Sequence, residues 1–330
     1  MSTPVYFAPM EGLTDAVFRR CHHTVFTGVT AYYMPFISPT QNLVLTGREK
    51  HNILPEYNKD TPCVPQVLTK DEQHFLWAAR MLADMGYTEI NLNAGCPSGT
   101  VTAKGKGAGI LRDVKQLDYF LEDVCAHSPL PVSVKTRIGF STPEEWAALL
   151  SVYAQYPLKA LIIHPRTCRE RYDPGTIHPD CWQAACETYP VPLVYNGDLF
   201  SVREMEALLR RSPEGIGLML GRGLVAQPAM ARVFHGGAAL QVAELVRFHD
   251  LLVREWSQLY DDRVVMMKLR VVMKHLECCF TSTGRLPRQI RKARTLSELL
   301  EADHKLFNTC QLKPEPMFVP DELRETELHE

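Results

Sequence analysis

The sequence has no stretch approaching 18 consecutive apolar residues, so it predicts no membrane-spanning segment. Its ten cysteines form no Cys-x-x-Cys pair, and no group of histidines and cysteines has the spacing of a zinc site, so we expect no metal ion. No signal peptide begins at Met1, which leads us to expect a cytoplasmic protein with reduced thiols. The net charge of −2 indicates no class of partner by itself; only its distribution along the chain is informative.

What the chain does contain is a repeated strand–helix pattern. The strand-like runs are rich in Val, Ile and Leu rather than alternating with polar residues, which is typical of parallel strands covered by helices. The sequence therefore predicts an α/β fold, a (β/α)8 TIM barrel over residues 1–237. A doubly wound sheet is the alternative, but it would need a Gly-rich dinucleotide turn after the first strand, and Ala8-Pro9-Met10-Glu11-Gly12 is not one. The eight runs are Val5–Met10, Gly28–Met34, Pro62–Leu68, Glu89–Gly95, Pro131–Ile138, Ala160–Arg166, Pro192–Asp198 and Ile216–Gly223.

The pattern changes after Gly236-Gly237. Residues 238–311 show only helical spacing, which predicts a small C-terminal all-helical domain. Residues 312–330 are acidic and contain prolines, so we expect a loosely ordered tail there. We expect the protein to be a monomer.

One thiol lies where a barrel enzyme carries out its chemistry. Asn93-Ala94-Gly95-Cys96-Pro97 closes the apolar run that starts at Glu89, which places Cys96 at the C-terminal end of a strand. Barrel enzymes build their active sites at this edge, whereas a structural cysteine is more often packed inside an apolar run. The turn alone leaves a reactive and a structural thiol about equally probable.

Polar residues also follow most of the other predicted strands. A single polar residue at a strand end is explained by solvation, but residues at seven strand ends together predict a binding site around the barrel mouth. These candidates are Pro9, Met10, Glu11, Gln66, Asn93, Cys96, Lys135, Arg137, His164, Arg166, Asn196, Gly197, Asp198, Gly221 and Arg222.

The last two predicted strands indicate what binds. Asn196-Gly197-Asp198 and Gly221-Arg222-Gly223 place glycines and an arginine where barrels bind phosphate, although Gly-Arg-Gly alone could be a tight surface turn. A phosphate-tailed cofactor whose ring covers the barrel mouth is FMN more readily than a dinucleotide. Lys135 and Gln66 suit the flavin ring, because a cation stabilises the anionic reduced flavin and an amide can bind its pyrimidine edge.

The combined motifs resemble those of the tRNA-dihydrouridine synthase family. The resemblance covers the whole barrel and, more weakly, the helical region. It departs from the family pattern at Asn91, Asp198 and Gly109, which leaves the subgroup open. The motifs are Ala8-Pro9-Met10-Glu11-Gly12 with Thr14-Asp15, Pro65-Gln66-Val67, Asn93-Ala94-Gly95-Cys96-Pro97, Val134-Lys135-Thr136-Arg137, His164-Pro165-Arg166-Thr167, Asn196-Gly197-Asp198 and Gly221-Arg222-Gly223.

This resemblance implies a flavoprotein that reduces a uridine of the tRNA D-loop to dihydrouridine. NADPH would reduce FMN as a transient partner, a hydride would pass from flavin N5 to uracil C6, and Cys96 would protonate C5. By the same resemblance, Asn93 would contact the uridine, Arg137 and Arg166 the base or nearby phosphates, and His164 the flavin phosphate or ring edge. Met10-Glu11-Gly12 and the compact length favour the bacterial type that modifies position 16, and position 20 stays open.

A strongly basic segment provides a candidate RNA surface. Residues 263–294 contain nine lysines and arginines against the single acid Glu277, a local charge of +8. A merely solvated helix face usually carries mixed signs, and a uracil that must be extruded from folded RNA needs a basic surface to hold that RNA. The predicted contacts are Lys268, Arg270, Arg288, Arg291 and Arg294.

Two alternative functions remain at this stage. An FMN barrel oxidoreductase for a free pyrimidine, resembling the dihydroorotate dehydrogenases, would share the barrel and a loop cysteine but would not need a basic helical domain. An RNA-binding protein that has lost catalysis is the other alternative, and the presence of Cys96, Lys135 and Arg222 gives it no support.

Overall fold

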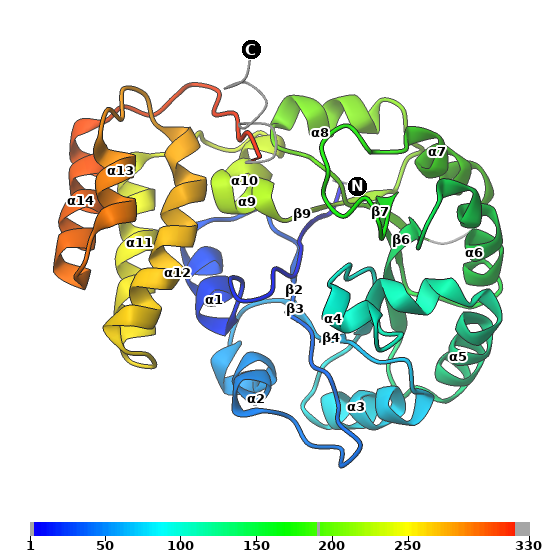
Figure 1. Ribbon diagram of the computed structural model, residues 1–330. Helices are drawn as coiled ribbons and strands as arrows, with labels where there is room; N and C mark the ends of the chain where they lie inside the picture. The colour runs from blue at the N-terminus through cyan, green and yellow to red at the C-terminus, as the bar shows by residue number, and fades with distance from the viewer. Residues whose placement is uncertain (1–2, 190–191, 321–330) are drawn as a thin grey trace.

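The computed structural model describes residues 3–189 and 192–320. Figure 1 shows a ring of strands enclosed by helices, with a separate group of helices, α11 to α14, packed on one side of the ring. Of the acidic tail predicted at 312–330, residues 321–330 lie outside the described part of the chain.

Nine strands of the described chain form a single parallel sheet in the order β3-β2-β1-β9-β8-β7-β6-β5-β4. Its two end strands, β3 and β4, are halves of the predicted third strand, separated by Pro65, which has no N–H to give to a ladder. Since the chain itself joins these halves, the ring closes and the predicted (β/α)8 barrel is confirmed. The strands are β1 (Val5–Phe7), β2 (Ala31–Tyr33), β3 (Cys63–Val64), β4 (Gln66–Val67), β5 (Ile90–Ala94), β6 (Val132–Gly139), β7 (Leu161–Thr167), β8 (Leu193–Tyr195) and β9 (Gly217–Leu220).

Several strands end earlier than the sequence predicted. β1 ends at Phe7 rather than Met10, because Pro9 cannot donate to the neighbouring strand. β8 ends at Tyr195 rather than Asp198, whose φ of 25° lies outside the extended region. The polar residues that follow these strands therefore lie in the first loop positions above the barrel.

Five of the barrel helices in the described chain, α1, α2, α3, α5 and α8, begin at a polar side-chain cap. The Asp113 side chain, for example, accepts hydrogen bonds from the backbone N–H groups of Lys115 and Gln116 at the start of α5. The helices are α1 (Ala16–Val25), α2 (Gly47–Ile53), α3 (Glu72–Asp84), α4 (Gly99–Thr102), α5 (Val114–His127), α6 (Trp146–Tyr153), α7 (Pro179–Thr188), α8 (Val202–Leu209), α9 (Arg222–Ala226) and α10 (Met230–Phe234), with 3-10 turns η1 (Pro55–Tyr57), η2 (Gly107–Arg112) and η3 (Pro143–Glu145).

Four further helices follow the barrel, as predicted for residues 238–311. The first of them, α11, packs on α1 through aromatic rings: the ring of Phe248 lies 5.5 Å from that of Phe18 and 5.4 Å from that of Phe26. None of the helices in the described ranges is long and apolar enough to cross a membrane. These helices are α11 (Val242–Ser257), α12 (Asp262–Leu276), α13 (Leu286–Lys292) and α14 (Leu296–Thr309), with the turn η4 (Glu277–Cys279).

The described part of the tail, residues 312–320, is packed against the protein. The Phe318 ring stacks on His275 at 5.2 Å and lies 5.3 Å from the ring of Phe200. The side-chain amide of Gln227 donates to the carbonyl of Pro316 at 2.9 Å. The prediction of a loosely ordered tail is therefore wrong for this part, because a buried aromatic ring, that of Phe318, and a hydrogen bond from Gln227 hold it.

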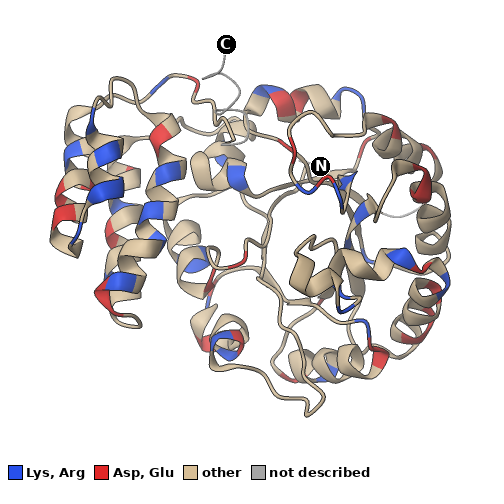
Figure 2. Ribbon diagram, in the orientation of Figure 1, with Lys and Arg blue, Asp and Glu red and all other residues tan. Residues whose placement is uncertain are grey.

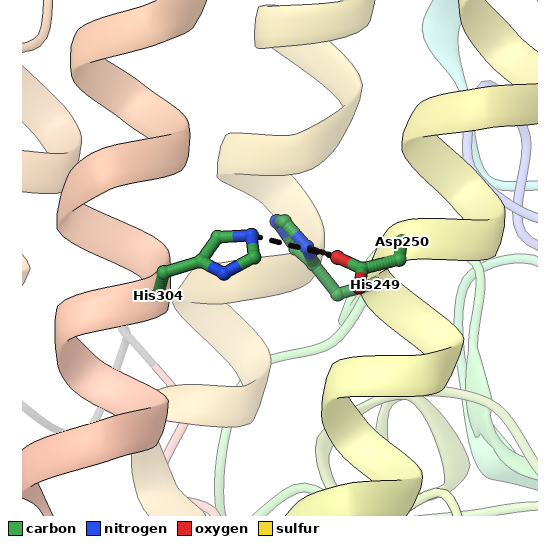
Figure 3. Close-up of side chains that lie close together, drawn as sticks. All are labelled: His249, Asp250 and His304. Atoms are coloured by element: carbon green, nitrogen blue, oxygen red, sulfur yellow. Dashed lines mark hydrogen bonds and ion pairs between the residues drawn. The ribbon is translucent and has the colours of Figure 1, made fainter.

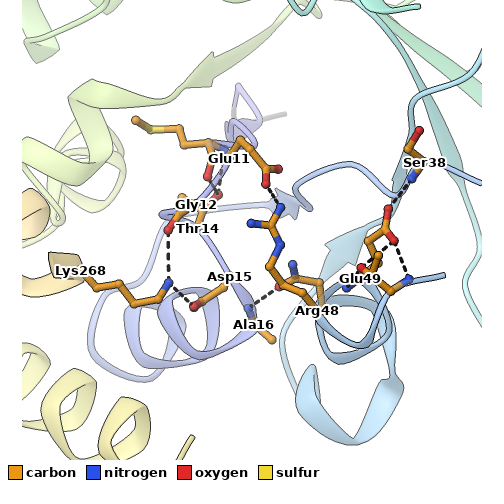
Figure 4. A network of polar contacts seen from close by, with 12 residues as sticks. Glu11, Gly12, Thr14, Asp15, Ala16, Ser38, Arg48, Glu49 and Lys268 are labelled. Atoms are coloured by element: carbon orange, nitrogen blue, oxygen red, sulfur yellow. Dashed lines mark hydrogen bonds and ion pairs between the residues drawn. The ribbon is translucent and has the colours of Figure 1, made fainter. Parts of the chain in front are cut away.

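A buried ion pair joins the helical domain to the barrel. Lys268 of α12 is only 8% exposed, and its ammonium donates to the carboxylate of Asp15 at 2.8 Å and to the carbonyl of Gly12 at 3.2 Å (Figure 4). The indole N–H of Trp256 donates to the same carboxylate at 3.1 Å. Lys268 is thus occupied inside the protein, and its predicted contact with RNA is wrong.

Replacing Lys268 by alanine should lower the free energy of unfolding by about 3–5 kcal/mol, because the substitution leaves the buried Asp15 carboxylate without its cation. Urea denaturation followed by circular dichroism measures this loss. The exposed Arg288→Ala substitution is the control, and it should change stability by less than about 0.5 kcal/mol. A loss below about 1 kcal/mol for Lys268→Ala would contradict the assigned role.

Candidate active site

A cavity of about 390 Å³ opens at the C-terminal ends of the strands. Its lining residues come from the C-terminal parts of strands and from the loops that follow them around the barrel, as the polar strand ends predicted. All but one of the predicted barrel-mouth candidates line it, the exception being Arg166, and the ligand contacts assigned to them remain predictions. They are Pro9, Met10, Glu11, Gln66, Asn93, Cys96, Lys135, Arg137, His164, Asn196, Gly197, Asp198, Gly221 and Arg222.

The half-buried Cys96 is held by its neighbours on both sides. The side-chain oxygen of Asn93 accepts hydrogen bonds from the N–H of Gly95 at 3.1 Å and of Cys96 at 2.9 Å. Arg137 donates through Nε to the carbonyl of Gly95 at 2.8 Å. Gly107, with a φ of 57°, allows the following loop to pack closely, since a Cβ there would lie 2.9 Å from the carbonyl oxygen of Cys96. The thiol therefore has a defined position at the barrel mouth.

A chain of hydrogen bonds through the barrel interior fixes the amides beside this turn. Asn93 donates to the Gln66 oxygen at 2.7 Å, and Gln66 donates to the Asn91 oxygen at 2.7 Å. Asn91 donates to the Ser133 hydroxyl at 2.9 Å, which in turn donates to the Glu89 carboxylate at 2.6 Å. Because one hydrogen of each amide nitrogen is used, Asn93 and Gln66 each keep one N–H that can bind a ligand.

The cavity is lined by basic groups, and burial lowers the pKa values of two of them, Lys135 and His164. Burial, followed by the charge of Arg137, lowers the pKa of Lys135 to about 7. Burial, followed by the charges of Arg137, Lys135 and Arg166, lowers the pKa of His164 well below its ordinary value. The neutral ring of His164 donates from Nδ1 to the carbonyl of Asn196 at 2.6 Å, so its buried Nε2 is a lone-pair acceptor without a partner among residues 3–189 and 192–320.

Asp198 organises the predicted phosphate-binding end. Its carboxylate accepts hydrogen bonds from Arg222 at 3.0 Å and from Arg166. Nearby, a Cβ on Gly223 would lie 2.3 Å from the carbonyl oxygen of Leu199, so only glycine permits these two loops to meet. Arg222 is thus oriented toward this end of the cavity before any anion binds.

The predicted substrate contact of Arg166 must be revised, whereas that of Arg137 stays a prediction. Arg166 is 0% exposed and is absent from the cavity lining, and its Nε donates to the hydroxyl of Thr176 at 2.9 Å. The guanidinium of Arg166 forms an ion pair with the carboxylate of Asp198. Arg166 therefore positions Asp198 instead of contacting the predicted uridine. Arg137 does line the cavity, but it also donates to the carbonyl of Thr167 at 2.8 Å and of Arg171 at 2.7 Å.

Sequence reasoning missed an aromatic group at the cavity. Tyr172, which is 48% exposed, lies in the loop after β7, where its ring centre is 5.0 Å from the guanidinium carbon of Arg137 and 5.6 Å from that of Arg222. Phe200, after β8, lies 5.3 Å from the guanidinium of Arg222. Tyr172 follows the His-Pro-Arg-Thr motif by five residues, and that position in a barrel-mouth loop was the available signal.

The predicted RNA surface is smaller than its sequence suggested. Arg288, Arg291 and Arg294, on and just after α13, are exposed, and Figure 2 shows the basic bands along α12 and α13. Arg270 is half-buried and donates to the carbonyl of Ala293 at the end of α13, so its predicted contact with RNA is replaced by a structural one.

Comparison with known proteins shows the family of this chain. A model of the dihydrouridine synthase family matches residues 6–313, which include all of the barrel strands except the first residue of β1, and helices α11 to α14. The chain belongs to the dihydrouridine synthase family.

Curated relatives of this dihydrouridine synthase carry matching names. A "probable tRNA-dihydrouridine synthase" of Rhodobacter capsulatus is 27% identical over 281 residues, covering 84% of this chain and 86% of the relative. A "tRNA-dihydrouridine(16) synthase" of Aquipseudomonas alcaligenes is 29% identical over 269 residues, covering 77% of this chain and 83% of the relative. Among solved structures, a morphinone reductase mutant in complex with tetrahydroNAD has a TM-score of 0.51 at 11% identity, covering 74% of this chain and 90% of that one, which supports the barrel fold alone.

The lowered pKa of Lys135 has a consequence for stability in the ligand-free protein. The pKa of Lys135 is about 7 in the folded state, and that of an exposed lysine is 10.5. At pH values between these two, the unfolded chain binds more protons than the folded one. Lys135 therefore destabilises the fold fully below pH 7, and this penalty disappears as the pH rises toward 10.5. Lys135→Met should raise Tm by a few degrees at pH 6.5 and by progressively less up to pH 10.

Thermal unfolding of the ligand-free wild type and variant at a series of pH values tests this. Lys115→Met, at an exposed position of α5, is the matched control and should give no such trend. A gain in Tm for Lys135→Met that does not change with pH would contradict the assignment.

Proposed function

We propose that this dihydrouridine synthase reduces a uridine of the tRNA D-loop to 5,6-dihydrouridine, with FMN as cofactor and NADPH as reductant. The observation that carries the proposal is Cys96, a thiol held by Asn93 and Arg137 at the mouth of a cavity whose remaining polar groups suit a flavin. Curated relatives named as tRNA-dihydrouridine synthases support the same substrate class.

The residues present fit FMN. Backbone groups around Gly197 and Gly221, together with Arg222, would hold its phosphate, while Lys135 and Gln66 would lie by its ring. Nε2 of His164, which has no hydrogen-bond partner among the described residues, is an acceptor. It therefore suits a hydroxyl or N–H donor of the cofactor. It does not suit the phosphate, whose oxygens are acceptors themselves. Bound FMN would supply the hydride that reduces the uracil.

The chain's own part in the reaction is orientation and proton transfer. The free N–H groups of Asn93 and Gln66 can donate to carbonyl oxygens of the bound ring systems. Cys96 would give its proton to uracil C5 on the side where Asn93 and Arg137 hold it. An anionic ligand beside Lys135 would favour its charged form and so raise its pKa from about 7.

The basic surface would hold the RNA while one base enters the cavity. Arg288, Arg291 and Arg294 lie within seven residues at the end of one short helix, a spacing that can follow a phosphate backbone. A uracil must leave its stack to reach the barrel mouth, and D-loop bases are unpaired enough to do so cheaply. We propose position 16 as the target, in line with the relatives named position-16 synthases.

Replacing Cys96 by alanine should reduce dihydrouridine formation by about 10²–10⁴-fold, because the reduced ring is left without its proton donor. Flavin binding and flavin reduction by NADPH should be unchanged. Dihydrouridine is measured in purified tRNA after single turnover, and flavin reduction by its absorbance. Cys125→Ala on α5 is the matched control and should behave as wild type.

Near-normal dihydrouridine formation by Cys96→Ala would overturn the proton-donor role. Reduction of a free pyrimidine without any reaction on tRNA would overturn the substrate class instead and favour a free-pyrimidine oxidoreductase. Mapping of the product in the tRNA distinguishes position 16 from position 20.

Changing Arg288, Arg291 and Arg294 together to glutamine should weaken tRNA binding and flatten its salt dependence by about 0.7–0.9 log units per lost phosphate contact. The flavin spectrum and NADPH oxidation should not change, because these residues lie outside the cavity lining. Binding is measured at two salt concentrations.

The control for this variant removes the same charge elsewhere, at Arg203, Arg210 and Arg211, which are exposed on and after α8. If both triple variants bind as wild type does, the RNA contacts another face. If the α8 variant alone loses affinity, that face is the RNA surface and the proposed one is wrong.

A further inference from the structure

Three potential metal ligands meet in the helical domain, outside the cavity at the barrel mouth. His249 and Asp250 come from α11 and His304 from α14, and one ligand atom of each lies within 4.8 Å of the others (Figure 3). We propose that these three residues bind a zinc ion, which would join α11 to α14.

The distances between these groups match those around a small tetrahedral ion. The Oδ1 atom of Asp250 lies 3.1 Å from Nδ1 of His249 and 3.5 Å from Nε2 of His304. Zinc bonds of 2.0–2.1 Å in tetrahedral geometry place neighbouring ligand atoms about 3.3 Å apart. Both distances are close to this value, and the remaining distance, between the two histidines, is within 4.8 Å and would shorten when they bind one ion.

A buried carboxylate orients the central ligand. Nε2 of His249 is hydrogen-bonded to Asp303 at 3.1 Å, and the two residues are 1% and 0% exposed. A histidine ligand of a metal commonly donates its second ring N–H to a carboxylate in this way, which leaves the first nitrogen as a lone pair for the ion. Asp303 would fix both the tautomer and the ring orientation of His249.

The charge balance also favours a dication. Two carboxylates, Asp250 and Asp303, flank the His249 ring, and the second oxygen of Asp303 is buried without a hydrogen-bond partner in the described ranges. A zinc ion beside neutral His249 would balance both negative charges.

The site is accessible, because the side chains of Asp250 and His304 are 53% and 46% exposed. Water would complete the coordination of the ion, as at other zinc sites with three protein ligands.

Isothermal titration of untagged, chelator-treated full-length protein with zinc chloride tests the proposal. We expect one ion per chain and a rise in Tm with zinc present, since the folded arrangement would bind the ion more tightly than the unfolded chain does. His304→Ala and Asp250→Asn should each weaken binding at least tenfold, and Asp303→Asn should weaken it about 10–100-fold by freeing the His249 ring. Cobalt added in place of zinc should show no thiolate charge-transfer band, which excludes binding by the ten cysteines.

His127→Ala is the matched control. His127 is also an exposed helical histidine beside an aspartate, with Nδ1 3.0 Å from Asp123, but it has no third ligand within the described chain. This variant should bind zinc as wild type does. Absence of zinc binding by wild type, or equal binding by the His304→Ala and Asp250→Asn variants, would overturn the proposal. His249 would then be an imidazolium between two carboxylates.

Discussion

The guanidinium of Arg137 is the contact on which the geometry of the cavity depends. It binds the carbonyls of Gly95, Thr167 and Arg171, and so ties the thiol-bearing turn after β5 to the loop after β7. Thr167 is 1% exposed, and its carbonyl would cost about 1–3 kcal/mol if it were left buried and unpaired. The position of Cys96, the direction of the Tyr172 loop and the shape of the cavity between them follow from this one side chain.

The charges around the cavity explain why an anionic, phosphate-bearing cofactor suits it. Lys135, Arg137 and Arg222 line it, whereas Asp198 at the phosphate end is already shared between two arginines. Burial, followed by the charges of neighbouring cationic residues, lowers the pKa values of Lys135 and His164. A bound anion would reverse that effect, so that affinity for the cofactor and the protonation state of the cavity are linked.

The barrel and most of its mouth could be predicted from the sequence, because strand periodicity and the residues that follow each strand are local signals. The corrections concern residues whose partners lie far away in the chain. Lys268 was assigned to RNA by charge, yet it lies between Val265 and Val272 on the apolar face of α12, and its partner Asp15 is 253 residues distant. His249 and His304 likewise approach one another only when α11 packs on α14. The spacing of residues along the sequence therefore could not reveal the proposed metal site.

The anchoring of Phe318 against Phe200 has a consequence for synthesis on the ribosome. The last barrel strand ends at Leu220, and the barrel could close long before Phe318 is made. Phe200 lines the cavity beside Arg222, but its aromatic partner is made almost a hundred residues after that strand. Because synthesis starts at the N-terminus, one wall of the cavity receives its support well after the strands of the barrel have been made. A nascent chain halted before Phe318 would have a closed barrel with an unfinished pocket.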